Sequence, residues 1–245
     1  MTDWTGIRQI CKVDTSLNYG RHLIRKFLRD AAPFDSVLDI GSGKGDDLLY
    51  CREICPSADL AGIDLNEENL KVLARQEMRG ISVNIESDPI PFSDSSVQVI
   101  IINQVLEHVK EIFWVWHEMT RVLQPGGSIL VGVPNLASLH NRLLLAFGRQ
   151  PTAIHLHSAH IRGYTRDGLM SFLARAWPGG YTVADYGGSN FYPFPAALAK
   201  PLARLFPGLA WGLFLSLVKS DRPYSDEFIR YPIDSRLETK YWVGQ

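Results

Sequence analysis

The sequence predicts a doubly wound α/β fold, in which a mostly parallel β-sheet is covered by helices on both faces. Residues 37–40, an apolar segment that includes one acid, lead directly into glycines at positions 41, 43 and 45. A strand that ends in such a tight turn, with a helix just beyond it, is typical of a parallel sheet. After this unit, strand-like and helix-like segments alternate, as a doubly wound sheet requires. Because ligands of these sheets bind outside the carboxyl ends of the strands, we expect the glycine turn to lie at a binding site.

The individual elements are expected where the apolar periodicity changes between the two patterns. Strands are expected near residues 36–40, 59–63, 81–85, 97–102 and 128–133, and helices near 44–55, 67–79 and 110–123. The segment Pro125-Gly126-Gly127 is expected to end the last of these helices with a turn into the fifth strand. Two apolar segments, near 179–183 and 212–218, are expected to close the sheet.

One segment precedes this minimal pattern and two others exceed it. Residues 1–34 read as a helical lead-in, residues 136–165 interrupt the sheet after its fifth strand, and residues 221–245 form a polar, aromatic tail. Residues 195–207 are expected to form a short amphipathic helix. We expect this helix to pack on the sheet, because its two basic residues make a weak lipid anchor.

Length and composition bound the class of protein. The 245 residues are 46% hydrophobic, which is enough for one sizeable core. The formal net charge of −1 provides no basic field, so no nucleic-acid partner is expected. Three cysteines fit a reduced compartment better than a disulfide framework. The N-terminus lacks the layout of a signal peptide and no apolar run reaches the length of a membrane span, so we expect a cytoplasmic chain without stable membrane insertion.

The residues around the glycine turn indicate which ligand it suits. A dinucleotide fingerprint requires a third glycine where this chain has Asp46, and a phosphate-binding P-loop requires a glycine where it has Leu38. Asp39 precedes the turn and Asp46-Asp47 follow it, and these acids would repel the diphosphate that a helix N-terminus otherwise attracts. They suit a ligand with a cationic end. S-adenosylmethionine has an ammonium, a sulfonium and a ribose with two hydroxyls, and it carries no phosphate.

A further acid stands at the carboxyl end of the second expected strand. Asp64 follows residues 59–63 directly, and a carboxylate at this tip is placed to accept hydrogen bonds from both ribose hydroxyls. The alternative is that Asp64 only caps the helix that begins at Glu67. Asn66 is able to cap that helix without Asp64, which favours the ribose role.

The glycine turn, Asp64 and three further motifs together resemble the class I S-adenosylmethionine-dependent methyltransferases, in the branch related to small-molecule methyltransferases. The further motifs are Ile90-Pro91-Phe92-Ser93-Asp94, Val105-Leu106-Glu107-His108-Val109 and Arg121-Val122-Leu123-Gln124-Pro125-Gly126-Gly127. The resemblance covers residues 35–135 well, and more weakly extends through Leu169 and again near residues 213–219. It implies a Rossmann-like seven-stranded sheet whose last strand is antiparallel. It also implies S-adenosylmethionine as the methyl donor and S-adenosylhomocysteine as the product.

The resemblance divides the chain into segments of one methyltransferase domain. These are a helical N-terminal cap at 1–34, a cofactor-binding core at 35–135, an insertion on the substrate side at 136–178, closing strands at 179–220 and a C-terminal tail at 221–245. In the family the N-terminal segment often closes over the cofactor, which makes Tyr19 and Arg21 candidate contacts. Arg21 is either a partner of the cofactor carboxylate or a solvated residue on a helix face.

The family's cofactor contacts carry over onto matching positions. Counting back from Ile90 puts Glu86 at the place of the adenine-binding acid, although the acids of this loop are alternatively solvated side chains. Asn103, at the tip of the fourth strand, is expected to contact the methionine part of the cofactor. The candidate cofactor-binding residues are Asp39, Gly41, Ser42, Gly43, Asp46, Asp64, Leu65, Glu86, Ser87, Asp88, Asn103 and Gln104.

A base is needed only if the acceptor atom must lose a proton, and histidine is the natural candidate. Related sequences carry a histidine near the place of His160, which makes this residue the candidate catalytic base; a hydrogen-bonded structural role is the alternative. His108, at an expected helix start, reads as structural. The spacing of His155, His157 and His160 matches no standard metal site, so no metal is expected. The polar and aromatic insertion around them is the expected acceptor pocket.

Three classes of function remain open on the sequence. The leading one is methyl transfer from S-adenosylmethionine, by in-line displacement, to an oxygen, nitrogen or carbon atom of a small molecule. The second is a methyltransferase that acts on RNA or protein, and the third is a cofactor-binding scaffold without turnover. The aromatic tail, with Tyr231 and Trp242, is able to bury against a partner chain as in a homodimer, or to cover the chain's own pocket.

Overall fold

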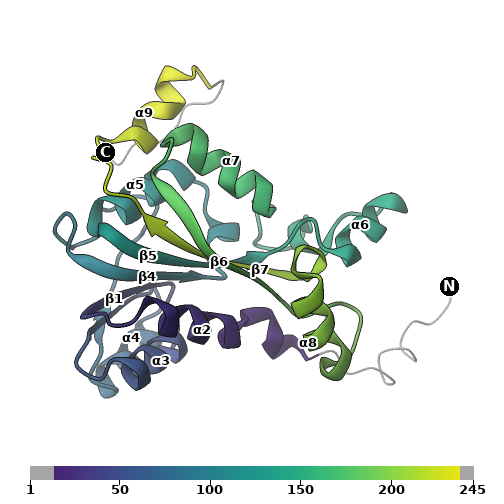
Figure 1. The fold of residues 1–245 in the computed structure, drawn as a ribbon, viewed down its shortest axis with the longest axis horizontal. Coiled ribbons are helices and arrows are strands. Elements are labelled where there is room, and N and C mark those ends of the chain that lie inside the picture. The colour runs from purple at the N-terminus through teal and green to yellow at the C-terminus, as the bar shows by residue number, and fades with distance from the viewer. Residues whose placement is uncertain (1–13, 238–245) are drawn as a thin grey trace.

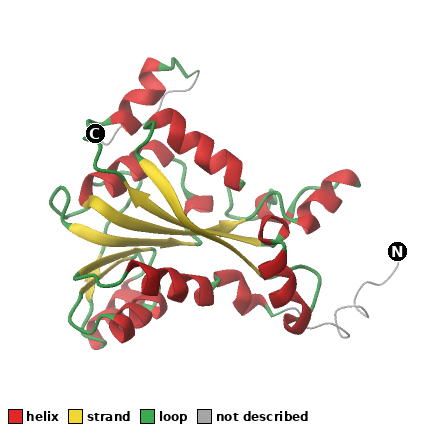
Figure 2. Ribbon diagram, viewed as in Figure 1, coloured by secondary structure: helices red, strands yellow, loops and turns green. Residues whose placement is uncertain are grey.

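The computed structural model describes residues 14–237, and its strands form one sheet (Figures 1 and 2). The strands are β1 (Ser36–Ile40), β2 (Asp59–Ile63), β3 (Arg79–Ile81), β4 (Val97–Asn103), β5 (Leu123–Pro134), β6 (Tyr181–Ser189) and β7 (Gly212–Lys219). Their order across the sheet is β3-β2-β1-β4-β5-β7-β6. The pairs among β1 to β5 are parallel, whereas β7 is antiparallel to both β5 and β6. The predicted fold class, a seven-stranded doubly wound sheet with an antiparallel last strand, is confirmed.

Helices cover both faces of this sheet (Figure 1). The helices are α2 (Arg21–Ala31), α3 (Asp46–Ile54), α4 (Glu67–Arg75), α5 (Ile112–Val122), α6 (Leu139–Ala146), α7 (Arg166–Ala176), α8 (Ala196–Leu205) and α9 (Glu227–Asp234). Short 3₁₀ helices are η1 (Thr15–Tyr19), η2 (Leu106–His108), η3 (Thr152–Ile154) and η4 (Pro207–Leu209). α2, α3, α4 and α8 lie on one side of the sheet, and α5, α7 and α9 lie on the other.

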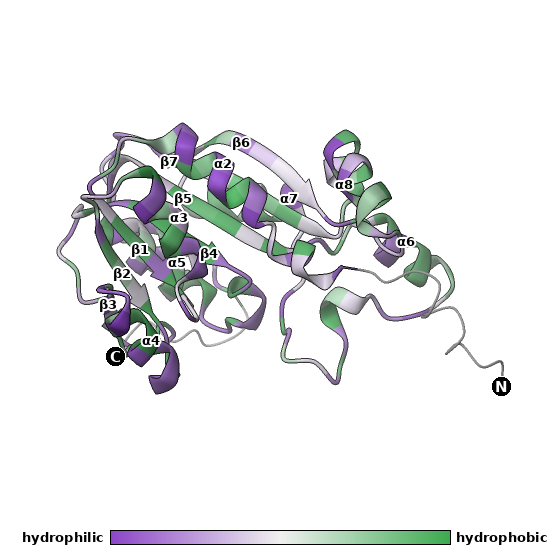
Figure 3. Ribbon diagram, turned by 90° about the horizontal axis from the view of Figure 1, so that it is seen from below, coloured by the Kyte–Doolittle hydropathy of each residue, from purple (hydrophilic) through white to green (hydrophobic). Residues whose placement is uncertain are grey.

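Strand β4 shows why the sheet needs both layers. Successive residues of a strand point to opposite faces. Ile100 and Ile102 pack on one face, in the buried cluster that includes Val115 of α5. Val99 and Ile101 pack on the other face, in the cluster that includes buried residues of α2 and α3. All four side chains are buried, and Figure 3 shows β4 and β5 as largely hydrophobic. A strand buried on both faces reads as a continuous apolar run, which is what the sequence shows.

The segments outside the minimal fold pack on the same domain. α8 confirms the amphipathic helix expected at 195–207, with Ala199 and Ala203 buried and Lys200 exposed. In the tail, α9 packs on α5: Phe228 is buried and lies 6.0 Å from the ring of Trp116. Among the described residues, no helix has the length and apolar character needed to cross a membrane. The expectations for residues 1–13 and for Trp242 lie outside the part of the chain that is described.

Two predicted boundaries are wrong. The third strand was expected at 81–85, but β3 pairs with β2 at Arg79–Ile81 and the chain leaves the sheet after it. The reason is that α4 ends early, since Glu77 adopts a positive φ of 57° and returns the chain to the sheet. Pro125-Gly126-Gly127 was expected to form a turn before the fifth strand. Instead Leu123 already pairs with Val97, and the three residues form an irregularity inside β5.

Candidate active site

The glycine turn joins the carboxyl end of β1 to α3 and lies against the tip of β2. Gly41, Gly43 and Gly45 have φ angles of 70°, 54° and 82°, a region that favours glycine. The backbone N–H groups of Gly41 and Ser42 donate to the oxygen of Ile63 at 2.8 and 3.0 Å. A Cβ atom added at Gly41 or Gly45 would collide with a neighbour, but one added at Gly43 would meet nothing within 4 Å. Gly43 is therefore the point where this backbone faces open space.

Asp64 holds the turn against β2. Its carboxylate accepts hydrogen bonds from the backbone N–H of Gly43 at 2.9 Å, from that of Asn66 at 2.7 Å and from Nδ2 of Asn69 at 3.1 Å. The N-cap of α4 is Asn66, whose side chain accepts from Glu68 N. Asp64 is thus free of the capping task, and a carboxylate offers about four acceptor positions, of which these bonds use three. The neighbouring Leu65 is exposed.

Two further acids lie buried behind the turn. Burial, followed by the neighbouring carboxylates of Asp47 and Asp64, raises the pKa of Asp39 well above its ordinary value. Burial also raises the pKa of Asp47. Oδ2 of Asp47 accepts a hydrogen bond from Nδ2 of Asn103 at 2.9 Å, whereas its Oδ1 has no hydrogen-bond partner among the described residues.

Arg21 brings a cation to the same edge. Its Nη2 donates to Oδ2 of Asp46, its Nε lies 3.9 Å from Oδ1 of Asp47, and its guanidinium lies over the ring of Tyr19 at 5.0 Å. Arg21 is thus paired with an acid at the site edge, and its role as a partner of the cofactor carboxylate stays a prediction. One cation beside two acids matches the charge pattern of an amino acid, which has both an ammonium and a carboxylate.

The tip of β4 carries polar atoms without partners. Oδ1 of Asn103 and Nε2 of Gln104 are buried and make no hydrogen bond to any described residue. Gln104 also has a positive φ of 59°, which is a strained conformation for a residue with a side chain. Buried polar groups normally find partners, so unpaired atoms at the carboxyl edge of a parallel sheet indicate a polar ligand.

The acids expected at the adenine end are placed differently from one another. Oε1 of Glu86 accepts the backbone N–H groups of Lys110 and Glu111 at the start of α5, which leaves its Oε2 for a ligand. Asp88 is exposed and bonds locally to Ser87 Oγ at 3.1 Å. The structure thus ties Glu86 to α5, and leaves the adenine contact of these three residues a prediction.

His160 lies beside residues that follow β4. Its ring centroid is 4.9 Å from that of His108, and a ligand atom of each histidine lies within 4.8 Å of one from Glu107. Glu107 is buried, its Oε2 has no partner, and burial raises its pKa to about 7. We call these residues the Glu107–His108–His160 cluster. His155 pairs instead with His157, at 4.9 Å between ring centroids.

The sequence reasoning missed Glu107. Its signal was present in the Leu-Glu-His-Val motif, but nothing local marks a glutamate in that motif as buried. Its burial depends on the insertion, because the backbone oxygen of Glu107 accepts N–H groups from Ile161 and Arg162, 54 and 55 positions further on.

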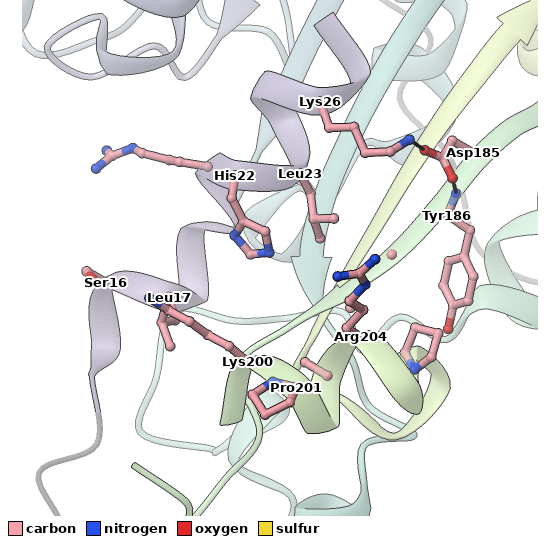
Figure 4. Close-up of a pocket in the computed structure, with 15 residues that line it drawn as sticks. Ser16, Leu17, His22, Leu23, Lys26, Asp185, Tyr186, Lys200, Pro201 and Arg204 are labelled. Atoms are coloured by element: carbon pink, nitrogen blue, oxygen red, sulfur yellow. Dashed lines mark hydrogen bonds and ion pairs between the residues drawn. The ribbon is translucent and has the colours of Figure 1, made fainter. Parts of the chain in front are cut away.

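A separate cavity of about 910 Å³ opens between α2, β6 and α8 (Figure 4). Its lining includes His22, Lys200 and Arg204, and Lys26 pairs with Asp185 across one side. No residue of the glycine turn or of the Glu107–His108–His160 cluster lines it. The cavity touches the site edge only through Arg21.

Comparison with known proteins gives a family match for the central part of the chain. Residues 38–131 match the family described as a methyltransferase domain. An arsenite methyltransferase of Halobacterium salinarum is 32% identical over 106 residues, which are 41% of this chain and 27% of that protein. A ubiquinone/menaquinone biosynthesis C-methyltransferase of Pasteurella multocida is 29% identical over 127 residues, 47% of each protein. The chain spans less than half the length of these relatives.

Solved structures share the fold over most of the chain. The 1,6-didemethyltoxoflavin-N1-methyltransferase of Burkholderia thailandensis, solved with 1,6-didemethyltoxoflavin and S-adenosylhomocysteine, has a TM-score of 0.57 at 18% identity, covering 83% of this chain and 80% of that one. Identity this low shows the fold alone. Together with the family match over residues 38–131, it supports the predicted resemblance to the class I S-adenosylmethionine-dependent methyltransferases, whose cofactor is S-adenosylmethionine.

The residues at the carboxyl edge fit that cofactor. Gly43 leaves open space for close approach, and Asp64 retains acceptor capacity beside it. The unpaired buried atoms of Asn103 and Gln104 are polar, and Asp46 lies beside Arg21 so that opposite charges are both available. Among the described residues, the acids Asp39, Asp46, Asp47 and Asp64 surround this turn, which disfavours a diphosphate.

Proposed function

We propose that the chain transfers a methyl group from S-adenosylmethionine to an oxygen, nitrogen or carbon atom of a small-molecule acceptor. The observation that supports this most strongly is the meeting of open backbone at Gly43 with the carboxylate of Asp64 and the unpaired tip of Asn103-Gln104. When bound, S-adenosylmethionine supplies a methyl group on a sulfonium sulfur that leaves as a neutral thioether. The leaving group therefore needs no new anion-stabilising site.

The chain's task is then chiefly orientation. Holding nucleophile, carbon and sulfur in line accounts for much of the acceleration in such a displacement. In this proposal the remaining acceptor position of Asp64 accepts from a ribose hydroxyl. Arg21 and the acids at the start of α3 hold the amino-acid end, and the loop of Glu86, Ser87 and Asp88 lies at the adenine end. Asp39 is buried and influences the cofactor only indirectly, through its electrostatic interaction with the carboxylates of Asp47 and Asp64.

We assign the acceptor to the side of the insertion, beside the Glu107–His108–His160 cluster. Nδ1 of His160 lies 3.0 Å from the backbone oxygen of Ala153, so this nitrogen is the donor and Nε2 keeps a free lone pair. A neutral nitrogen of this kind accepts the proton that an acceptor hydroxyl must lose. The cavity between α2, β6 and α8 is a weaker choice, because its lining includes neither the glycine turn nor Asn103 or Gln104.

Two relatives favour a small acceptor, since one is an arsenite methyltransferase and the other is a C-methyltransferase of ubiquinone/menaquinone biosynthesis. The net charge of −1 argues against an RNA substrate. A scaffold without turnover is the remaining alternative. The proposal also includes a cytoplasmic location and a homodimer.

The test is a transfer assay with methyl-labelled S-adenosylmethionine against arsenite, a demethylated quinol, total RNA and casein. We expect label on a small molecule and none on RNA or protein. With the acceptor that takes label, His160→Ala should lower the turnover rate, whereas Lys200→Glu, on the rim of the separate cavity, should leave it unchanged. Cofactor binding without transfer to any acceptor would favour the scaffold, and label on RNA would favour a macromolecular substrate.

A further inference from the structure

The residues that follow the tip of β4 gather three metal-ligating groups from two distant segments. Glu107 and His108 belong to η2, and His160 belongs to the insertion. One ligand atom of each lies within 4.8 Å of the others. From this geometry we infer a divalent-metal site formed by Glu107, His108 and His160.

Both histidines are prepared as ligands by their backbone contacts. Nδ1 of His108 lies 3.1 Å from the oxygen of Ala159, and Nδ1 of His160 lies 3.0 Å from the oxygen of Ala153. A carbonyl oxygen only accepts, so in both rings Nδ1 carries the proton. The lone pair is therefore on Nε2 in each case. Metal-binding histidines in proteins are oriented by this kind of outer hydrogen bond.

The carboxylate supplies the independent observation. Glu107 is 1% exposed, and its Oε2 makes no hydrogen bond to any described residue. A buried carboxylate oxygen without a donor is costly, and a cation beside it removes the cost. The same residue anchors the insertion through its backbone oxygen, so the ligands on both segments are held in register.

The ligand set selects the class of ion. Two imidazoles and one carboxylate, with further coordination positions open, suit a first-row transition ion such as Zn²⁺, Fe²⁺ or Co²⁺, and suit Mg²⁺ or Ca²⁺ poorly. His108 is exposed and His160 is half-buried, so solvent or a ligand has access to the open positions. The cluster follows β4 directly, on the side that the proposed function assigns to the acceptor.

The role of the ion in methyl transfer rests on the proposed function. The inference that the cluster binds an ion does not depend on that function. A metal in this position binds an acceptor oxygen and lowers the pKa of its hydroxyl, so that the proton is lost to solvent before the oxygen attacks. His160 would then act as a ligand and not as the proton acceptor. This makes the acceptor an oxygen compound, such as a phenol or a hydroxylated ring.

The experiment is a Co²⁺ titration of chelator-treated, untagged protein, followed by visible absorption, with Zn²⁺ competition to rank the ions. We expect saturation near one ion per chain and bands in the visible region that report nitrogen and oxygen ligands. His108→Ala and His160→Ala should each weaken binding at least tenfold, as should Glu107→Gln. His157→Ala, an exposed residue of the same loop that lies outside the cluster, is the matched control and should bind like the wild type.

The outcomes separate the two claims. Absence of Co²⁺ binding, or equal binding by wild type and all three ligand variants, overturns the metal site even if S-adenosylmethionine binds and turns over. Loss of S-adenosylmethionine binding with normal Co²⁺ binding overturns the proposed function and leaves the metal site standing. If Glu107→Gln does not fold, the two histidine variants decide, because neither side chain is in the core.

Discussion

Asn103 donates a hydrogen bond from Nδ2 to Oδ2 of Asp47 at 2.9 Å, and this bond joins the tip of β4 to the first turn of α3. The same Nδ2 also donates to the backbone oxygen of Tyr19 at 3.0 Å. One amide thus connects three segments that are far apart in the sequence. Because Asp47 is buried, the bond fixes the position of an acid that faces the site edge.

Replacing Asn103 with leucine should lower the free energy of unfolding by about 1–3 kcal/mol, because a buried carboxylate loses its donor. Asp47→Leu should have a comparable effect. The double variant should lose less than the sum of the two, by about 0.5–3 kcal/mol, since the interaction is removed only once. Urea unfolding of the four proteins measures this difference. Strictly additive losses would mean that the bond contributes nothing to stability.

Gly43→Ala and Gly126→Ala make a matched pair. Both glycines have positive φ angles and open space around an added Cβ, so the left-handed backbone should cost each variant about 1–2 kcal/mol of stability. Gly126 lies at the amino end of β5, at the opposite edge of the sheet from the turn.

We expect only Gly43→Ala to weaken S-adenosylmethionine binding, by about tenfold or more, since its methyl group fills the space that the ligand needs. Calorimetric titration of both variants checks this. Equal affinities would show that the cofactor does not approach this backbone.

Asp64→Ala should weaken S-adenosylmethionine binding by about 1.5–3 kcal/mol, the range for lost hydrogen bonds that involve a charged group. Asp59→Ala, at the exposed start of the same strand, is the control and should not change the affinity. The measurement is equilibrium dialysis with labelled cofactor. Unchanged binding by Asp64→Ala would reject the ribose role, and weakening by both variants would point to a general charge effect.

Asp39 should make the protein less stable as the pH rises. Burial raises its pKa above the ordinary value of 3.8, so over the interval between the two the folded chain holds a proton that the unfolded chain has lost. The titration of Asp39 therefore has no effect on the free energy of unfolding below pH 3.8. Its effect becomes increasingly unfavourable as the pH approaches the raised pKa of the folded chain.

Asp39→Asn removes this titration. Relative to the wild type, its free energy of unfolding should increase as the pH is raised above 3.8, as measured by urea unfolding at a series of pH values. Asp59→Asn, an exposed acid, should follow the wild type throughout. A constant difference between Asp39→Asn and the wild type would contradict the raised pKa.

The parts of the fold that local pattern controls were predictable. The continuous apolar run of β4 and the glycine turn each carry their signal within a few residues, and the structure has both as expected. The third strand was misplaced because its position depends on pairing with Ala61 to Ile63 of β2, which the sequence of 79–85 does not encode by itself.

The site shows the same division. Gly43, Asp64 and Asn103 follow or end parallel strands. The carboxyl ends of neighbouring parallel strands lie at the same edge of a sheet, so the sequence predicts that these residues lie close together. Glu86 was assigned from spacing to the adenine, yet one of its oxygens serves the start of α5. Neither that contact nor the meeting of Glu107 with His160 leaves a trace in local sequence, since each joins segments that only the folded chain brings together.

Calorimetric titration of the wild-type chain with S-adenosylmethionine, with NAD⁺ and ATP as competitors, is the most direct test of the site. The acid-rimmed turn predicts saturable binding of one S-adenosylmethionine per chain, with no displacement by either phosphate-bearing ligand. Heat of binding for NAD⁺ or ATP together with none for S-adenosylmethionine would contradict it.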